Sequence, residues 1–193
     1  MARSEALPIQ NPEEALQVLR KERVLSLTDT RGLRSLVGEV LGKVHGSWWG
    51  HPEGGRVYEI ASELERSREV LGAKLVDGKV AFVHRALWPQ LLRVVTDPNW
   101  RRERQRGLNQ PAKQLLAQVE KDGKLALQGR APARGDLEKR ALLLSSSEHT
   151  PAGRHAVVLR SWEDWATDEL KEEAKGLDFE KSLAELRAAH LTL

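Results

Sequence analysis

Two spacings of apolar residues divide this sequence into helical and extended segments. Apolar residues three and four positions apart predict helices over residues 12–21, 31–41, 55–68, 86–95, 110–121, 134–141 and 178–189. Short apolar runs, several of them alternating with polar residues, predict strands over residues 24–27, 73–76, 79–84, 124–128, 142–147 and 155–159. A further helix is expected after Ser161, and Tyr58 is assigned to the apolar face of the helix over 55–68. The pattern predicts an α+β protein that is mainly α.

Local signals fix some of these elements more firmly. Asn11 followed by Pro12 starts the first helix, because the Asn side chain can cap it and Pro suits the first helical position. Residues 28–30 offer a similar cap for the second helix. Asp77-Gly78 lies between two apolar strands and is typical of a type I′ turn, which needs positive φ at both residues. We therefore predict a β-hairpin over residues 73–84.

The order of the predicted elements suggests an architecture. Helix, strand, helix, helix and hairpin follow one another in the first half, as in a winged helix, and a shortened second pattern begins near residue 110. The prediction is tandem winged-helix-like units whose β-hairpins are the wings. The expected parts are a flexible leader (1–10), a first unit (11–95), a basic linker (96–109), a second unit (110–165) and C-terminal helices (166–193).

Composition adds mainly exclusions. The 31 basic and 28 acidic residues give a net charge of +3, so a nucleic-acid partner would have to be recognised by clustered rather than bulk charge. The absence of cysteine excludes disulfides and thiolate zinc sites. Apolar runs are far shorter than the roughly 20 residues that span a bilayer, and the first residues lack the apolar core of a signal peptide. We expect a cytoplasmic protein with no membrane partner.

Two stretches carry a resemblance. Residues 46–88, with Ser-Trp-Trp-Gly-His-Pro at 47–52, resemble bacterial proteins of no assigned activity, and residues 142–165 resemble the wing and following helix of bacterial winged-helix proteins. Related-looking chains occur near the DNA glycosylases built from tandem winged helices. The catalytic signature of that family, two glutamines flanking one apolar residue, is absent, because Gln110 and Gln114 have the wrong spacing. The resemblance therefore implies a winged-helix fold and a nucleic-acid partner. It implies no catalytic residue in this chain.

The first candidate site is the loop that contains Trp48 and Trp49. An indole there could stack on an unpaired or flipped base, while His45, Ser47 and His51 contact phosphate or a base edge. Alternatively, one indole fills the core and its neighbour covers a seam. Because neighbouring residues of an extended loop point opposite ways, we expect one tryptophan to face inward and the other outward.

Two further possibilities surround this loop. The backbone N–H groups of Gly54-Gly55, at the start of the third helix, could hold an anion. Three imidazoles, those of His45, His51 and His84, could in principle share a metal ion, although their spacing is not diagnostic and a strand-end histidine more often bonds to backbone. We expect no metal and no cofactor. Arg56 is a candidate phosphate contact on the third helix.

The most basic run contains four arginines in six positions: Arg101, Arg102, Arg104 and Arg106. Guanidinium groups match phosphate oxygens and give affinity that does not depend on base sequence. The same run can equally be a solvated helix face on which Glu103 pairs with its neighbours.

The second wing offers Arg154 and His155, together with serines 145–147 and His149, for contact with a DNA backbone. A polar hairpin tip exposed to water has the same composition.

Three functions remain open, because no catalytic motif is present. The first is a DNA-binding protein whose third helix and arginine run contact duplex DNA, mainly at the backbone. The second is a protein–protein interaction adaptor built on winged helices. The third is a nucleic-acid-processing enzyme with its site in the loop from His45 to His51. A continuous positive stripe would favour the first, and an exposed apolar patch the second.

Overall fold

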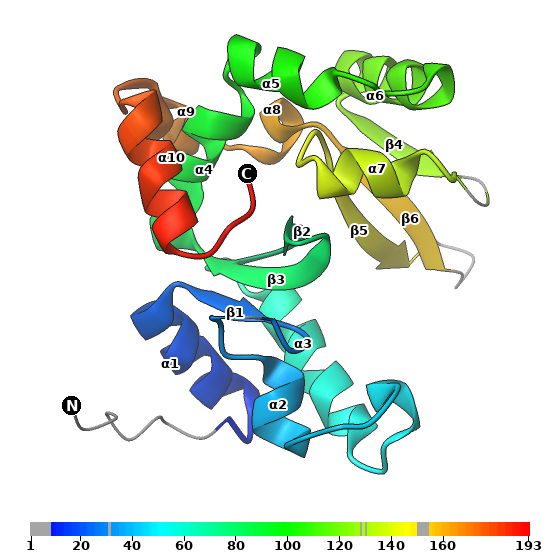
Figure 1. The fold of residues 1–193 in the computed structure, drawn as a ribbon, viewed down its shortest axis with the longest axis vertical. Helices are drawn as coiled ribbons and strands as arrows, with labels where there is room; N and C mark the ends of the chain where they lie inside the picture. Colours follow the sequence, from blue (N-terminus) through cyan, green and yellow to red (C-terminus); the bar gives the residue numbers. More distant parts are fainter. Residues whose placement is uncertain (1–8, 31, 128, 130, 150–154) are drawn as a thin grey trace. The chain divides into compact units, whose positions relative to one another are not determined.

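The structure is a computed structural model that describes residues 9–30, 32–127, 129, 131–149 and 155–193 (Figure 1). It is an α+β protein with two small antiparallel sheets. Contacts divide the chain into two compact units: unit 1 comprises residues 1–72 and 79–87, and unit 2 comprises residues 73–78 and 88–193. In the described part of the chain, no helix is both long and apolar enough to cross a membrane.

Unit 1 has three α-helices and most of a three-stranded sheet. Its elements are α1 (Pro12–Glu22), β1 (Val24–Ser26), α2 (Leu36–Leu41), the 3₁₀ helix η1 (Trp48–Gly50), α3 (Gly54–Arg66), β2 (Val70–Val76), β3 (Lys79–His84) and the 3₁₀ helix η2 (Arg85–Leu87). The Asn11 side chain accepts a hydrogen bond from the Glu14 N–H (2.9 Å) and Pro12 opens α1, as predicted. Most of β2 lies in the segment 73–78, which belongs to unit 2.

The sheet of unit 1 has the order β1-β3-β2. Strands β1 and β3 are antiparallel, with Leu25 opposite Phe82, and both of these side chains are fully buried. Asp77 (φ 48°) and Gly78 (φ 70°) form the turn between β2 and β3, so the predicted hairpin is confirmed. The helices α1 and α3 supply Leu19 and Ile60 to the same core.

Two predictions for unit 1 are wrong in detail. The second helix begins at Leu36 rather than near residue 31, because Ser35 caps it and the Asp29 carboxylate accepts a hydrogen bond from the Ser35 hydroxyl. The expected leader also ends earlier than residue 10. The side chain of Ile9 is buried in the core, and the Gln10 carbonyl accepts a hydrogen bond from Arg56 Nε (3.0 Å).

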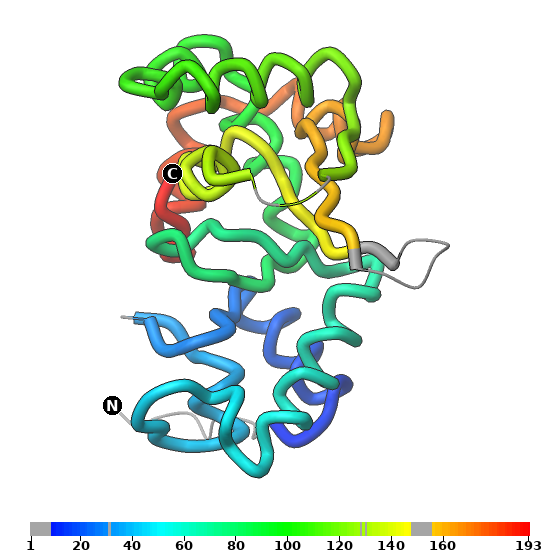
Figure 2. Tube along the Cα trace, turned by 90° about the vertical axis from the view of Figure 1, so that its right-hand side faces the viewer, coloured from blue at the N-terminus to red at the C-terminus, as the bar shows by residue number. Residues whose placement is uncertain are grey.

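Unit 2 contains the second sheet and seven helices among its described residues. They are α4 (Trp88–Val95), α5 (Pro98–Gln105), α6 (Gln110–Asp122), β4 (Lys124–Leu127), α7 (Arg134–Lys139), β5 (Leu144–His149), β6 (His155–Arg160), α8 (Trp162–Trp165), α9 (Asp168–Lys175) and α10 (Phe179–Ala188). The sheet order is β4-β6-β5. Leu159 of the central strand β6 lies opposite Leu125 of β4 and opposite Ser145 of β5. The second predicted hairpin is therefore confirmed (Figures 1 and 2).

Helix α4 lies in unit 2, although the sequence suggested that it closes the first unit at residue 95. It packs against both α9 and α10 (Figure 1). Four of its eight residues, Leu91, Leu92, Val94 and Val95, are almost completely buried. This broad apolar surface requires helices on more than one side, and the C-terminal segment supplies them.

The expected basic linker, residues 96–109, contains helix α5 and belongs to unit 2. The Asp97 carboxylate caps α5 by accepting hydrogen bonds from the N–H groups of Asn99 (3.0 Å) and Trp100 (3.1 Å). Pro98 occupies its first turn, and the Trp100 side chain is buried. This part of the chain is thus a packed helix.

Candidate interaction site at the Trp48–Trp49 loop

The loop between α2 and α3 begins at Gly42 (φ 70°) and turns again at Gly46 (φ 94°), before η1 and the start of α3 (Figure 2). Two hydrogen bonds close it: the His51 N–H donates to the Trp48 carbonyl (3.0 Å), and the Gly54 N–H donates to the His51 carbonyl (2.8 Å). A Cβ atom at Gly54 would lie 2.8 Å from the Trp48 carbonyl oxygen. Glycine at 54 therefore allows the close approach of loop and helix, and its N–H group is already used within the loop.

The two tryptophans of this loop differ sharply in exposure. Trp48 is 8% exposed and joins the core of unit 1, whereas Trp49 is 65% exposed. The expected inward and outward pair is confirmed. The expected reason is wrong, however, because the residues form a 3₁₀ turn rather than an extended loop. Their rings stack with centroids 4.1 Å apart and planes at 24°, so the buried indole supports one face of the exposed one.

Tyr58 extends the exposed aromatic area from the first turns of α3. Its ring centroid lies 6.0 Å from that of Trp49, with the planes at 48°, and its side chain is 53% exposed. We call Trp49 and Tyr58 the aromatic surface. Among the described residues they are the large hydrophobic side chains that remain exposed. Assigning Tyr58 to the apolar face was wrong, since Val57, Ile60 and Leu64 form that face.

The polar ends of both aromatic side chains are available. No described residue accepts a hydrogen bond from the Trp49 indole N–H or exchanges one with the Tyr58 hydroxyl. On exposed rings these groups are solvated, so an acceptor of a ligand can replace the water. The aromatic surface combines apolar faces with two hydrogen-bonding groups.

The charges next to the aromatic surface are mixed. Glu59 is exposed on α3 and has no ion-pair partner within the described part of the chain. Arg56 lies 3.7 Å from the Glu53 carboxylate and also donates to the Gln10 carbonyl, so its guanidinium is engaged within unit 1. At the other end of α3, Arg66 pairs with Glu63. The exposed side of this helix therefore offers phosphate few unengaged cations.

The remaining polar residues of the loop do not converge on one point. His45 and Ser47 are exposed, and Ser47 does not cap η1 with its side chain. His51 Nδ1 accepts a hydrogen bond from the Glu53 N–H (3.2 Å). His84 lies in β3, and its Nε2 is 3.3 Å from the Glu69 carboxylate. Among the described residues, no group of three His, Asp or Glu side chains is placed to hold a metal ion.

The arginine run divides into two engaged and two exposed side chains. Arg101 is 17% exposed, pairs with Glu120 and donates to the Val95 carbonyl (2.9 Å). Arg104 donates to the carbonyl oxygens of Arg140 (3.1 Å) and Lys139 (3.3 Å), and its guanidinium lies 5.3 Å from the Trp100 ring centroid.

Arg102 and Arg106 are exposed, and Arg106 pairs with Glu103 (2.8 Å). Two of the four arginines of the predicted run thus have partners inside unit 2, and two are exposed. Arg101 and Arg104 connect α5 to its neighbours inside unit 2.

The predicted contacts on the second wing can be placed only in part. Arg154 lies outside the described residues, and for His155 the structure describes the strand but not the side chain. The Ser145 hydroxyl donates to Glu138, so it faces the interior of unit 2. Glu138 is 3% exposed and also pairs with Lys74 and, at 3.4 Å, with Arg134. Sequence reasoning missed this buried carboxylate, because its ammonium partner, Lys74, lies 64 positions earlier in the chain.

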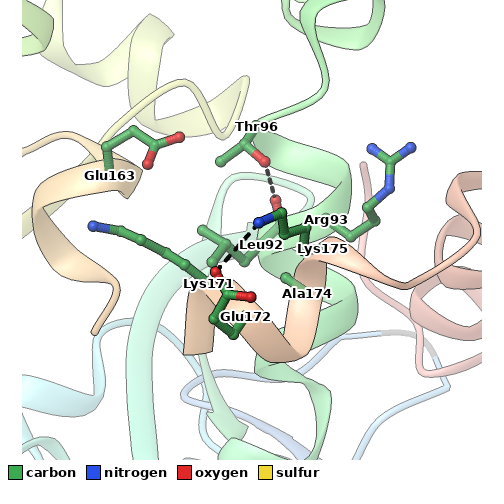
Figure 3. A pocket seen from close by; sticks show the side chains of 8 residues that line it. All are labelled: Leu92, Arg93, Thr96, Glu163, Lys171, Glu172, Ala174 and Lys175. Atoms are coloured by element: carbon green, nitrogen blue, oxygen red, sulfur yellow. Dashed lines mark hydrogen bonds and ion pairs between the residues drawn. The ribbon is translucent and has the colours of Figure 1, made fainter. Parts of the chain in front are cut away.

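Unit 2 also has a surface hollow of about 400 Å³ between α4, α8 and α9 (Figure 3). Arg93, Lys171 and Lys175 line it, together with Glu163 and Glu172. The Lys175 ammonium lies 3.4 Å from the Glu172 carboxylate. Other groups also have local partners, because Arg93 Nε donates to the Leu177 carbonyl (2.9 Å) and the Thr96 hydroxyl to Leu92 (2.6 Å). The hollow thus has nearly balanced charge.

No protein-family model, curated protein or solved structure matches this chain.

Proposed function

We propose that this protein is an interaction adaptor with winged-helix-like units, and that unit 1 binds a protein partner through the aromatic surface. The observation that carries the proposal is the exposed Trp49–Tyr58 pair resting on the buried ring of Trp48. The winged-helix assignment is supported by the order helix, strand, helix, helix and hairpin in unit 1. It is also supported by the shared sheet pattern, in which the last strand lies between the other two in both sheets.

Aromatic anchors are well suited to protein recognition. Tryptophan and tyrosine are enriched among the residues that dominate binding energy, because each buries a large rigid area and still offers a hydrogen-bonding group. Trp49 is already held by its stack on Trp48, so ordering it on binding costs less entropy than ordering a mobile side chain. A partner that covers both rings would meet a preformed site.

The charge distribution favours a protein partner over duplex DNA. Unit 1 has twelve Lys and Arg against eleven Asp and Glu, and unit 2 has nineteen against seventeen. Affinity for duplex DNA rests largely on cations that neutralise phosphates. Two of the four arginines in the candidate run are engaged inside unit 2, and the exposed face of α3 carries Glu59 and Glu63. Each of these features weakens a backbone-dominated DNA contact.

A peptide-library selection tests the proposal. Random peptides are selected on the intact wild-type chain, with counter-selection on Trp49→Ala, whose folding is checked by urea unfolding. We expect peptides that bind the wild type and lose at least about tenfold affinity for Trp49→Ala and for Tyr58→Ser. Glu172→Gln, a change on the exposed face of α9, serves as a control and should bind like the wild type. If no peptide that binds the wild type survives the counter-selection on Trp49→Ala, the aromatic surface is not the binding site.

A further inference from the structure

We propose that the aromatic surface recognises a proline-rich segment in the polyproline II conformation with a basic residue beside it. This inference rests on the proposed function of unit 1 as a protein-binding module. It names the chemistry of the partner from the size, the hydrogen-bonding groups and the charge of the surface.

The size of the surface excludes larger apolar ligands. Two exposed rings with centroids 6.0 Å apart form a short apolar site, whereas an amphipathic helix needs anchors over at least two of its turns. The ring planes are inclined at 48° to each other. Proline rings are compact and rigid and stack well on aromatic faces. A polyproline II segment presents them with little loss of conformational entropy, because it is largely preformed.

The hydrogen-bonding groups of the surface match the same ligand. The Trp49 indole N–H and the Tyr58 hydroxyl are donors without acceptors among the described residues. A polyproline II backbone has no internal hydrogen bonds, so its carbonyl oxygens are free to accept. A helical ligand has most of its carbonyls paired within the helix. The donors therefore favour an extended backbone, and a polyproline II segment is largely extended before it binds.

The charges near the aromatic surface indicate which residues flank the proline-rich core of the ligand. Glu59 follows Tyr58 on α3, is exposed and has no ion-pair partner among the described residues, whereas the Glu53 carboxylate is paired with Arg56 (3.7 Å). The Glu59 carboxylate repels phosphate groups, which argues against stacking of single-stranded nucleic acid on the same rings. It attracts Lys or Arg, and a guanidinium can also lie over an aromatic face. We infer a basic residue on at least one side of the proline-rich core.

The test uses fluorescence anisotropy with a labelled peptide of six consecutive prolines followed by two arginines. We expect a Kd between about 1 µM and 1 mM for the wild-type chain. Replacing the prolines by alternating glycine and alanine, or changing Trp49 to Ala, should weaken binding at least about tenfold. Replacing the two arginines by glutamates should weaken binding as well. Glu59→Gln should reduce the preference of the protein for the arginine peptide over the glutamate peptide, and added salt should reduce this preference in the wild type. Glu172→Gln is the charge-matched control.

The outcomes separate this inference from the proposed function. If library selection yields Trp49-dependent peptides without proline, the adaptor stands and the proline-rich ligand is overturned. If no Trp49-dependent peptide is found, both fail. If the glycine–alanine peptide binds as well as the proline peptide, or if the proline peptide does not bind, the inference is wrong. Tighter Trp49-dependent binding of an oligothymidine probe would assign the surface to single-stranded nucleic acid instead.

Discussion

Trp48 and Trp49 contribute unequally to the stability of unit 1, although they are adjacent and in contact. Trp48→Ala removes a buried indole and should lower the free energy of unfolding by about 3–5 kcal/mol. Trp49→Ala removes an exposed ring and its stacking contact, for which we expect about 0.5–1.5 kcal/mol. Urea unfolding of both variants measures the difference. Equal losses would show that Trp49 is part of the core, which would contradict its role as a binding residue.

The arginines of α5 provide a second residue-level prediction. Arg101→Ala should destabilise the protein by about 1–3 kcal/mol, because the Val95 carbonyl and the Glu120 carboxylate lose their donor. Arg102→Ala is the matched control on the same helix and should change stability by no more than about 0.5 kcal/mol, since its side chain is exposed. Thermal unfolding of the two variants distinguishes them. A destabilising Arg102→Ala with a neutral Arg101→Ala would contradict the assigned contacts.

At this scale the sequence identifies residue types but not their partners. The split between Trp48 and Trp49 was predictable, while their mutual stacking depends on the 3₁₀ turn. The exposure of Tyr58 did have a signal, because it falls one position out of phase with Val57, Ile60 and Leu64. The engagement of Arg101 had none, since its acceptors lie on elements before and after α5.

Two adjacent glycines at the start of α3 should respond oppositely to alanine. Gly54→Ala places a Cβ atom 2.8 Å from the Trp48 carbonyl oxygen, so we expect a loss of about 1–3 kcal/mol. Gly55→Ala meets nothing within 4 Å and should be neutral or stabilise the helix by up to about 1 kcal/mol. Chemical denaturation measures both. If Gly54→Ala is harmless, the loop does not need its close approach to the helix.

The Glu69 carboxylate links three segments of unit 1 and predicts an acid-sensitive contact. It accepts two hydrogen bonds from Arg20 on α1 (2.7 and 3.0 Å) and faces His84 on β3. Arg20 first, and His84 second, lower the pKa of Glu69 from 4.5 to about 2. The folded protein therefore holds this proton less tightly than the unfolded chain. The resulting stabilisation is present above about pH 4.5 and is lost as the pH falls toward 2.

Glu69→Gln should therefore be less stable than the wild type at pH 6, and the difference should shrink as the pH falls from 4.5 to 2. Urea midpoints measured at several pH values between 6 and 2.5 test this. Glu172→Gln removes an exposed carboxylate and should follow the wild type throughout. A difference between wild type and Glu69→Gln that stays constant with pH would rule out the ionised contact.

The start of a helix could be predicted where a capping residue is followed directly by proline. Asn11-Pro12 located the start of α1, and the equivalent pair Asp97-Pro98 marks the start of α5. The prediction placed this second pair in a basic linker over residues 96–109, because four arginines follow it. The start of α2 was less accessible, since Ser35 becomes the cap only when Asp29 folds back onto it.

For the whole molecule, the near-neutral charge of each unit predicts weak binding to duplex DNA. At about 150 mM salt we expect a Kd no tighter than about 10⁻⁴ M for any duplex, measured by anisotropy with a labelled 20-base-pair duplex. The control is the same measurement at low salt, where non-specific binding should strengthen. Nanomolar affinity with a steep dependence on salt would contradict this expectation and support a DNA-binding function.

The positions of the two hairpins along the chain were predictable from the sequence. The division of the chain into two units was less predictable. Helix and strand periodicity predicted two hairpins in the correct places, because each hairpin is specified by nearby residues. The assignment of α4 and of residues 73–78 to unit 2 depends on contacts with distant parts of the chain, such as the hydrogen bond from the Thr192 N–H to the Leu75 carbonyl (2.8 Å). Such contacts leave no periodic signal.

The stacked indoles of unit 1 also have an optical consequence. Two identical chromophores with centroids 4.1 Å apart and planes at 24° couple electronically, and the coupled transitions give paired circular-dichroism bands of opposite sign. Trp165 in unit 2 lies 5.6 Å from Trp162 and 5.1 Å from Trp88, and these three indoles form a second coupled group. Each unit thus contains its own chiral reporter. The spectrum of Trp49→Phe subtracted from that of the wild type would isolate the signal of the η1 turn and follow it separately from helix content.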